Sequence, residues 1–308
     1  MNEKIALGTW AWVPNDDVFG SNIDKEELRK AFKLGISNGL KLWDTAYAYG
    51  MGESEKILGE FVKDIARDDV ILSTKLTPQC IGYDGNSAME TLDNSLKRLN
   101  TDYVDIYWVH NSADVEKWTP ELIPLLKSGK VKKVGVSNYN LSQIKRANEI
   151  LTEAGYKLSA VQNHFSLLHR DSEEEGILDY CKENGITFFA YMVLEQGALT
   201  GKYDKEHPFK EGTDRANAYN DKLEELGSLI QKMQEIGNKY GVNAAEVGSA
   251  WAINKGTLPI IGVTKVKHVE GAIKSKDIVL TETEMQELED CANKLNVKTI
   301  RMWERMSN

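Results

Sequence analysis

Short apolar runs alternate with amphipathic stretches along almost the whole chain. The runs are rich in β-branched and aromatic residues, which favours buried strands of βαβ units. We predict eight strands, at Lys4–Leu7, Leu40–Asp44, Val70–Thr74, Val104–Val109, Lys133–Ser137, Ala160–Asn163, Thr187–Tyr191 and Leu258–Ile261. The stretches between them predict helices, among them Lys25–Asn38, Ala88–Leu99, Leu141–Ala154, Glu173–Asn184 and Ala244–Asn254.

Capping signals support these helices. Ser87 with Glu90 has the spacing of a capping box, and so has Asn243 with Glu246. Glycine readily adopts the left-handed conformation that ends many helices. It follows the predicted helix ends at Gly39, Gly155, Gly185 and Gly256.

Eight strand–helix units in 308 residues predict an α/β fold, a (β/α)8 TIM barrel. The alternative is an open doubly wound sheet, which usually has fewer strands. Two segments exceed a minimal barrel: an extended loop after the seventh strand, Met192–Gly241, and a C-terminal extension, Leu280–Asn308. We expect helices within them at Asp221–Tyr240 and Glu284–Leu295, the second followed by a tail. No linker-like stretch divides the chain, which favours a single domain over residues 1–308.

Composition narrows the possible functions. A net charge of −9 disfavours nucleic acid and anionic membranes as partners. No apolar run approaches the roughly 18 residues that span a bilayer, and the N-terminal stretch does not resemble a signal peptide. The three cysteines are scattered, without metal-ligand spacing, which fits a reducing compartment. We therefore expect a cytoplasmic protein that binds small molecules and no metal, with its oligomeric state open.

Polar side chains stand at the ends of three successive predicted strands. Asp44, Lys75 and His110 occupy these places, and Tyr49 follows five residues after Asp44. The carboxyl ends of parallel strands meet at one rim of a barrel, so these four groups should converge there. Together they can protonate a carbonyl oxygen. Each alone is more often structural, and Tyr47, in the barrel wall, is the alternative phenol.

A longer pattern surrounds these residues. It comprises Asp44–Gly50, Gly52–Glu55, Ser73–Lys75, His110, Gly135–Asn138, Gln162 with Asn163, and Gly197–Tyr203. In this order, and from Leu7–Trp10 to Pro259–Gly262, these motifs resemble the signature of the aldo-keto reductases. The resemblance implies a (β/α)8 barrel that binds a nicotinamide cofactor without a Rossmann domain. A competing dinucleotide motif at Gly50 and Gly52 lacks its third glycine, and we reject it.

The resemblance makes Tyr49 the general acid of reduction and the general base of oxidation. A free phenol has a pKa of about 10. One ammonium at roughly 3.5–4 Å and an effective dielectric near 20 contributes about 4 kcal/mol, enough to bring that pKa near 7. We therefore expect Lys75 to activate Tyr49, Asp44 to keep Lys75 charged, and His110 to orient the carbonyl or relay its proton.

The resemblance also implies cofactor contacts. Ser137, Asn138 and Gln162 match the residues that hold the nicotinamide amide, and Tyr191 matches the aromatic residue that stacks on its ring. Lys202 is expected at the pyrophosphate, and Gly262–His268 at the adenosine phosphate. The full set of expected contacts is Thr9, Trp10, Asp44, Ser137, Asn138, Gln162, Tyr191, Leu194, Gln196, Gly197, Lys202, Gly262, Thr264, Lys265 and His268. The cations favour NADP(H) over NAD(H), although His268, where the family often has Arg, is largely neutral at pH 7.

The sequence leaves the substrate and the reaction direction open. Pocket walls are expected from Trp10, Trp12 and the tail around Arg301–Glu304, which suits aromatic or alicyclic carbonyls or sugars. The leading hypothesis is an NADP-dependent carbonyl reductase or alcohol dehydrogenase. The alternative is a cofactor-binding regulatory protein resembling potassium-channel β subunits, which also keep the four residues. We favour the enzyme because no extended N-terminal segment is evident; an isomerase or lyase fits less well, because it does not need Ser137 and Asn138.

Overall fold

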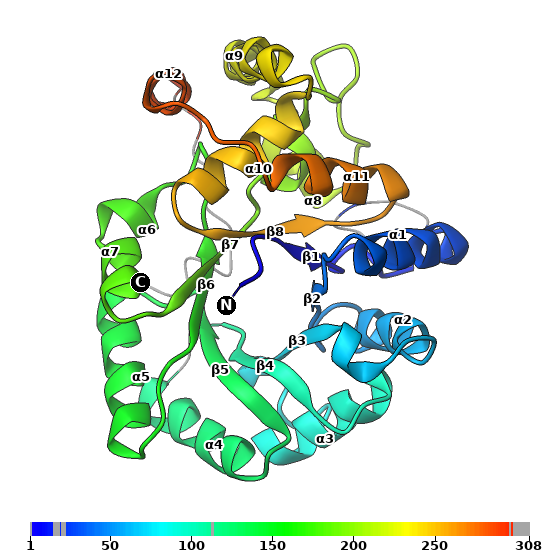
Figure 1. Ribbon diagram of the computed structural model, residues 1–308, viewed down its shortest axis with the longest axis vertical. Coiled ribbons are helices and arrows are strands. Elements are labelled where there is room, and N and C mark those ends of the chain that lie inside the picture. The colour runs from blue at the N-terminus through cyan, green and yellow to red at the C-terminus, as the bar shows by residue number, and fades with distance from the viewer. Residues whose placement is uncertain (1, 15–18, 20–22, 112–113, 296, 298–308) are drawn as a thin grey trace.

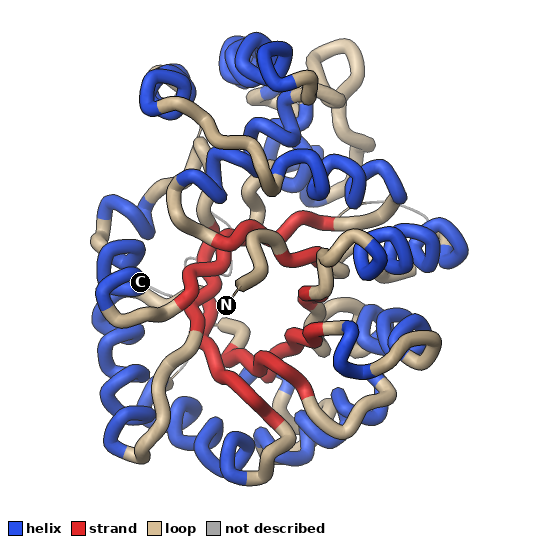
Figure 2. The backbone as a smooth tube through the Cα atoms, viewed as in Figure 1, coloured by secondary structure: helices blue, strands red, loops and turns tan. Residues whose placement is uncertain are grey.

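Eight parallel strands form a closed barrel in a computed structural model that describes residues 2–14, 19, 23–111, 114–295 and 297. Each strand pairs with the next one in sequence, and β8 pairs with β1. Figure 2 shows the strands as a ring enclosed by helices. The expected (β/α)8 TIM barrel is confirmed.

The eight strands lie where the apolar runs predict them, with ends shifted by at most two residues. Their bounds are β1 Ala6–Gly8, β2 Leu42–Asp44, β3 Ile71–Leu76, β4 Val104–Val109, β5 Val131–Ser137, β6 Ala160–His164, β7 Thr187–Tyr191 and β8 Leu258–Gly262.

Alternation along the strands separates two apolar layers. Side chains such as Leu42, Trp108 and Phe189 fill the barrel interior, and the residues between them pack outward against the helices. Because successive side chains point to opposite faces, Asp44 shares the inner face with Leu42. Polar residues at inward positions near the carboxyl ends of the strands therefore gather at one mouth of the barrel.

Helices surround the ring, and α9 and α12 lie outside it, with α9 packed on α10 and α12 (Figure 1). The helices are α1 Lys25–Ser37, α2 Glu53–Val62, α3 Ala88–Leu99, α4 Val115–Lys127, α5 Leu141–Glu153, α6 Asp171–Glu174, α7 Ile177–Glu183, α8 Asp214–Tyr219, α9 Leu223–Tyr240, α10 Ala244–Asn254, α11 Val266–Ser275 and α12 Glu282–Asn293. Short 3-10 helices are η1 Arg67–Asp69, η2 Pro78–Cys80 and η3 Glu195–Thr200. Thus α9 and α12 confirm the helices expected in the two extra segments.

Two local predictions need correction. The helix expected over Glu173–Asn184 is two helices, because Gly176 adopts a φ of +76° between α6 and α7. Ser87 caps α3, but the Glu90 carboxylate accepts a hydrogen bond from the Asn86 N–H, which lies outside the expected capping box.

Other local predictions agree with the structure. The capping box of Asn243 and Glu246 is present at α10. The glycines expected at helix ends all have positive φ, at Gly39, Gly155, Gly185 and Gly256. The C-terminal tail around Arg301–Glu304 lies outside the described residues. Within the described part of the chain, no helix has the length and apolar character to span a bilayer.

Candidate active site

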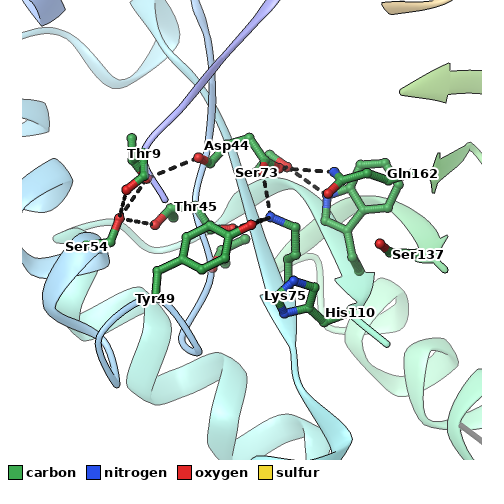
Figure 3. A network of polar contacts seen from close by, with 12 residues as sticks. Thr9, Asp44, Thr45, Tyr49, Ser54, Ser73, Lys75, His110, Ser137 and Gln162 are labelled. Carbon is green, nitrogen blue, oxygen red and sulfur yellow. Dashed lines mark hydrogen bonds and ion pairs between the residues drawn. The ribbon is translucent and has the colours of Figure 1, made fainter. Parts of the chain in front are cut away.

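The four side chains expected at the strand ends meet at the carboxyl end of the barrel, between β2, β3 and β4 (Figure 3). Lys75 Nζ lies 2.5 Å from Asp44 Oδ2, and it donates to the Tyr49 hydroxyl at 3.1 Å. It also donates to the Thr45 carbonyl at 2.8 Å. Lys75 is 1% exposed and Asp44 is 2% exposed, so the ion pair is removed from water.

Two further side-chain donors hold Asp44: Ser73, from the motif Ser73–Lys75, and Gln162, which the sequence predicts as a cofactor contact. Ser73 Oγ donates to Asp44 Oδ1 at 2.7 Å, and Gln162 Nε2 approaches the same oxygen at 3.4 Å. Trp108 Nε1 donates in turn to Ser73 Oγ at 2.7 Å. Ser73 lies two residues before Lys75 and therefore on the same face of β3, which brings its hydroxyl to the Asp44 carboxylate.

Electrostatics at the ion pair differ from the simple expectation. Burial lowers the pKa of Lys75, but Asp44 and Tyr49, through their charges and hydrogen bonds, together raise it by more, so the net pKa lies above the ordinary value. Burial raises the pKa of Tyr49, Lys75 lowers it and Asp44 raises it again, so this pKa also lies above its ordinary value. The expectation that Lys75 brings the phenol near neutrality is therefore wrong for this state. Tyr49 carries its proton at neutral pH.

His110 stands beside the phenol. Its Nδ1 lies 3.0 Å from Thr77 Oγ1, and its ring centroid lies 5.6 Å from that of Tyr49. Burial, with the charge of Lys75 adding to it, lowers the pKa of His110 well below the ordinary value of 6.5. The imidazole is therefore neutral at neutral pH.

Asn138 links this group to the next part of the rim. Its φ is +62°. Its side-chain Nδ2 donates to the His110 carbonyl at 3.0 Å and to Ser137 Oγ at 3.2 Å. The Tyr191 hydroxyl donates to Asn138 Oδ1 at 2.6 Å. Ser137 pairs in register with Gln162 on β6. The structure thus brings together the four residues expected at the nicotinamide.

Two residues expected near the mouth point elsewhere. Thr9 lies two residues after Leu7, whose side chain points outward from the barrel. The Thr9 side chain is fully buried, and its hydroxyl bonds to the Asp44 carbonyl and to Ser54 Oγ, as Figure 3 shows. It ties β1 to β2 and α2, so its side chain does not face the mouth as a cofactor contact would. Trp12, expected in the pocket wall, is also fully buried in the outer layer against Trp43.

Other expected contacts lie closer to the phenol or in the loop after β7. Trp10 stacks on Tyr49 at a centroid distance of 6.0 Å. Leu194, Gln196 and Gly197 are half-buried at η3. Lys202 is exposed just beyond η3.

His268 lies at the start of α11, in the segment expected at the adenosine phosphate. Its Nδ1 accepts the Thr264 N–H at 3.1 Å, so it holds the turn after β8. Burial, with the charges of Lys267, Lys265 and Lys202 adding to it, lowers the pKa of His268 to about 4. His268 is therefore neutral, and the cations available to a phosphate are the three lysines.

A carboxylate also lies at the start of α11. Glu27 Oε1, on α1, accepts the Val266 N–H at the first turn of α11, at 3.0 Å. Gly262 and Lys265 are exposed beside it, and Thr264 is half-buried. The donor set fits a dinucleotide phosphate, with one acidic group opposing it. The described residues hold no cluster of His, Cys, Asp or Glu that could bind a metal ion.

Known proteins resemble this chain over most of its length. The model of the aldo/keto reductase family matches residues 4–293. A chloroplastic pyridoxal reductase from Arabidopsis thaliana is 32% identical over 305 residues, which cover 94% of this chain and 82% of that protein.

Solved structures agree with the barrel. A glycerol dehydrogenase from Gluconobacter oxydans has a TM-score of 0.81 at 23% identity, covering 97% of this chain and 94% of that one, and so shares the fold. An aldo/keto reductase from Klebsiella pneumoniae in complex with NADP and acetate has a TM-score of 0.74 at 25% identity, covering 97% and 95%.

Proposed function

Because the chain belongs to the aldo/keto reductase family, a family of oxidoreductases, we propose that it interconverts a carbonyl compound and its alcohol with NADP(H). One observation carries this proposal most directly. Lys75 Nζ lies within hydrogen-bond distance of both the Tyr49 hydroxyl and the Asp44 carboxylate, at the mouth of the barrel. This arrangement supplies a proton to an oxygen atom and stabilises the charge left behind.

Tyr49 is the proton donor in reduction. Its phenol is protonated at neutral pH, since burial raises its pKa. When it protonates the carbonyl oxygen, the phenolate that remains lies 3.1 Å from the Lys75 ammonium. A nicotinamide dinucleotide, when bound, would supply the hydride, two electrons and one hydrogen, that the carbonyl carbon gains. In the oxidation direction the phenolate takes the proton from the alcohol.

Lys75 and Asp44 make this proton transfer possible. An ammonium buried without a partner tends to lose its proton. Asp44 prevents this loss, and the hydroxyl of Ser73 and the amide of Gln162 keep the carboxylate in place. The ion pair therefore presents a fixed positive charge to the phenol. This charge stabilises the phenolate that forms during proton transfer more than it stabilises the neutral phenol.

His110 orients the carbonyl. The imidazole is neutral, and its Nδ1 lies beside the Thr77 hydroxyl. With Nδ1 accepting from Thr77, Nε2 carries the proton and donates it in a hydrogen bond to the substrate oxygen. Two donors, Tyr49 and His110, would then address the same atom.

Cofactor binding falls to the other half of the rim. Ser137, Asn138 and Gln162 offer the donors and acceptors that a nicotinamide amide needs, and Tyr191 offers a ring to stack against it. For the phosphates, Lys202 and Lys265 provide charge. We propose a preference for NADP(H), supported by the related Klebsiella protein solved with NADP. The negative charge of the nearby Glu27 carboxylate opposes a bound phosphate and should make this preference smaller.

The test is a titration of the purified protein with NADPH and with NADH, followed by tryptophan fluorescence. A panel of carbonyls is then added, including an aromatic aldehyde such as 4-nitrobenzaldehyde. Pyridoxal is also included, because one relative is named a pyridoxal reductase. Binding of NADPH with its consumption on a panel member would support the proposal. Binding without turnover would favour the regulatory alternative, and no binding of either nucleotide would contradict the proposal.

A further inference from the structure

A carboxylate that plays no part in the proposed chemistry is completely buried in the loop after β7. Glu195 is 0% exposed, and its φ is +48°. Gln196, with φ +53°, and Met192, with φ +56°, share this left-handed conformation. Residues with a Cβ seldom adopt it, and it persists only where surrounding contacts impose it. Three such residues within five indicate that side-chain contacts hold this loop in shape.

Glu195 receives hydrogen bonds from three places in the fold. His164 Nε2, on β6, lies 2.8 Å from Oε1, and the hydroxyl of Ser166 bonds to the same oxygen. The Tyr219 hydroxyl, on α8, donates to Oε2 at 2.6 Å. Burial raises the pKa of Glu195, but the charge of His164 and these hydrogen bonds lower it by more, to about 2. The carboxylate is therefore ionised, and its hydrogen bonds are charge-assisted.

His164 carries the contact on to the proposed cofactor site. It lies two residues after Gln162 and so on the same inward face of β6. Its ring stacks on Tyr191 at a centroid distance of 5.6 Å and on His169 at 4.0 Å. The Tyr191 hydroxyl in turn donates to Asn138. A continuous series of contacts thus runs from the loop carboxylate to the residues assigned to the nicotinamide.

Simple burial of a carboxylate does not explain this arrangement. Glu284 is also nearly buried, has a pKa lowered to about 2 and accepts from a tyrosine hydroxyl, that of Tyr240. It caps α12, and its hydrogen bonds among the described residues are with Thr281, Lys239 and Tyr240. Glu195 differs because its partner His164 packs on the ring of Tyr191.

We propose that Glu195 and His164 are positioning residues for the dinucleotide: their buried pair fixes the Tyr191 ring and the η3 backbone in one arrangement. The proposal rests on the proposed function, because it concerns the same cofactor. Removing the carboxylate should loosen both the ring and the loop while leaving Asp44, Lys75 and Tyr49 in place. The nicotinamide half of the cofactor should then lose affinity, and the adenosine half should not.

The test compares wild type with Glu195→Gln, which keeps the size of the side chain and removes its charge. Dissociation constants are measured for NADPH and for adenosine 2′-monophosphate, a probe of the adenosine half alone. We expect NADPH to bind about tenfold or more weakly and the monophosphate to bind within about twofold of wild type. Equal weakening of both probes, or no weakening of NADPH, would overturn the proposal.

A structural readout accompanies the binding data. Amide hydrogen exchange of the peptide covering residues 192–201, without nucleotide, should accelerate in Glu195→Gln. The matched control is Glu284→Gln, which should lower stability without changing NADPH binding or exchange in that peptide. Faster exchange in both variants would mean that the effect is global, and would overturn the proposal.

A double-mutant cycle tests whether the two residues act as a pair. His164→Gln alone should weaken NADPH as Glu195→Gln does, and the double variant should be little worse than either. Additive losses would mean that the residues act separately. If Glu195→Gln does not fold, Tyr219→Phe removes one donor more gently and should shift NADPH affinity in the same direction, and an unchanged affinity would count against the proposal.

These outcomes are distinct from failure of the proposed function. A wild-type protein that binds neither NADPH nor NADH overturns the function itself. A wild-type protein that binds NADPH, together with a Glu195→Gln variant that binds it equally well, leaves the function standing and overturns only the positioning role.

Discussion

Two buried carboxylates on different sides of the barrel invite comparison. Asp44 and Glu195 are each almost unexposed, and each has three side-chain donors. Asp44 ends a regular strand, whereas Glu195 lies in a loop with φ +48°. The cationic partner of Asp44 touches the phenol of Tyr49, whereas His164 touches the ring of Tyr191.

The two carboxylates are therefore assigned different roles: Asp44 supports the proposed proton transfer, and Glu195 supports the proposed binding of the dinucleotide. On the Asp44 side, the register of β2, β3 and β4 fixes Asp44 and Lys75, and Tyr49 joins them from the turn that follows β2. On the Glu195 side, side-chain hydrogen bonds hold an irregular backbone. We therefore expect substitutions near Asp44 to abolish turnover, and substitutions near Glu195 to change affinity and acid stability.

The largest effect is expected for Tyr49→Phe. The proposed function makes the Tyr49 hydroxyl the proton donor to the carbonyl oxygen, so turnover of a panel carbonyl should fall by about 10²–10⁴-fold when it is removed. NADPH affinity should stay near that of wild type, because the hydroxyl acts on the substrate. Tyr47→Phe is the matched control, because the Tyr47 ring lies under Arg98 whereas Tyr49 bonds to Lys75, and it should keep most of the turnover. A larger loss in Tyr47→Phe would reassign the proton donor.

Lys75→Met should cost at least about two orders of magnitude in turnover, by loss of the charge that stabilises the phenolate. It also leaves Asp44 buried without its cation, which should destabilise the protein by about 3–5 kcal/mol. Denaturant unfolding measures this loss. The double variant Asp44→Asn with Lys75→Met should recover much of the stability and none of the activity. Recovery of both would remove the ion pair from the mechanism.

The pH dependence of the unfolding free energy in acid should show whether Glu195 is ionised in the folded protein. Its pKa falls from an ordinary value of 4.5 to about 2 in the fold, so the carboxylate stabilises the folded state above pH 4.5. This contribution, about 3 kcal/mol, is lost as the pH falls from about 4.5 to about 2. Unfolding free energies measured across that range should fall less steeply in Glu195→Gln than in wild type. Parallel curves would show that Glu195 is not held as an ionised group.

The smallest effects concern the charges at α11. Glu27→Gln removes the opposing carboxylate, so NADPH should bind a few-fold more tightly while NADH changes little. Lys265→Ala should weaken NADPH more than NADH. Glu26→Gln and Lys274→Ala are the controls, because both residues are exposed on the same helices. Equal changes for the two nucleotides would show that this place does not distinguish the 2′-phosphate.

Hydrophobic periodicity in the sequence predicts the Asp44 side well. Asp44 and Lys75 follow from their positions on short apolar runs, and the barrel follows from eight such runs in order. Tyr49 depends on the motif, because it lies beyond the strand. Its raised pKa did not follow from pairwise charge alone, since Coulomb attraction to Lys75 competes with burial and with Asp44.

The Glu195 side was largely hidden from the sequence. The motif placed Gln196 and Gly197 in a cofactor loop, but nothing in it showed that Glu195 turns inward. Its burial depends on a left-handed backbone and on donors from β6 and α8, which are distant in sequence. The place of His268 in the turn after β8 was hidden in the same way: the sequence predicts a largely neutral ring, but not that its Nδ1 accepts the Thr264 N–H.

The most direct test of the central claim uses NADPH labelled with deuterium at C4 of the nicotinamide. Wild-type protein is incubated in ordinary water with this nucleotide and the panel carbonyl that it consumes fastest, and the product alcohol is analysed by mass spectrometry. We expect one deuterium on the former carbonyl carbon, and at least about 100-fold less product from Tyr49→Phe over the same time. Product without the label, or equal labelled product from Tyr49→Phe, would contradict the assignment.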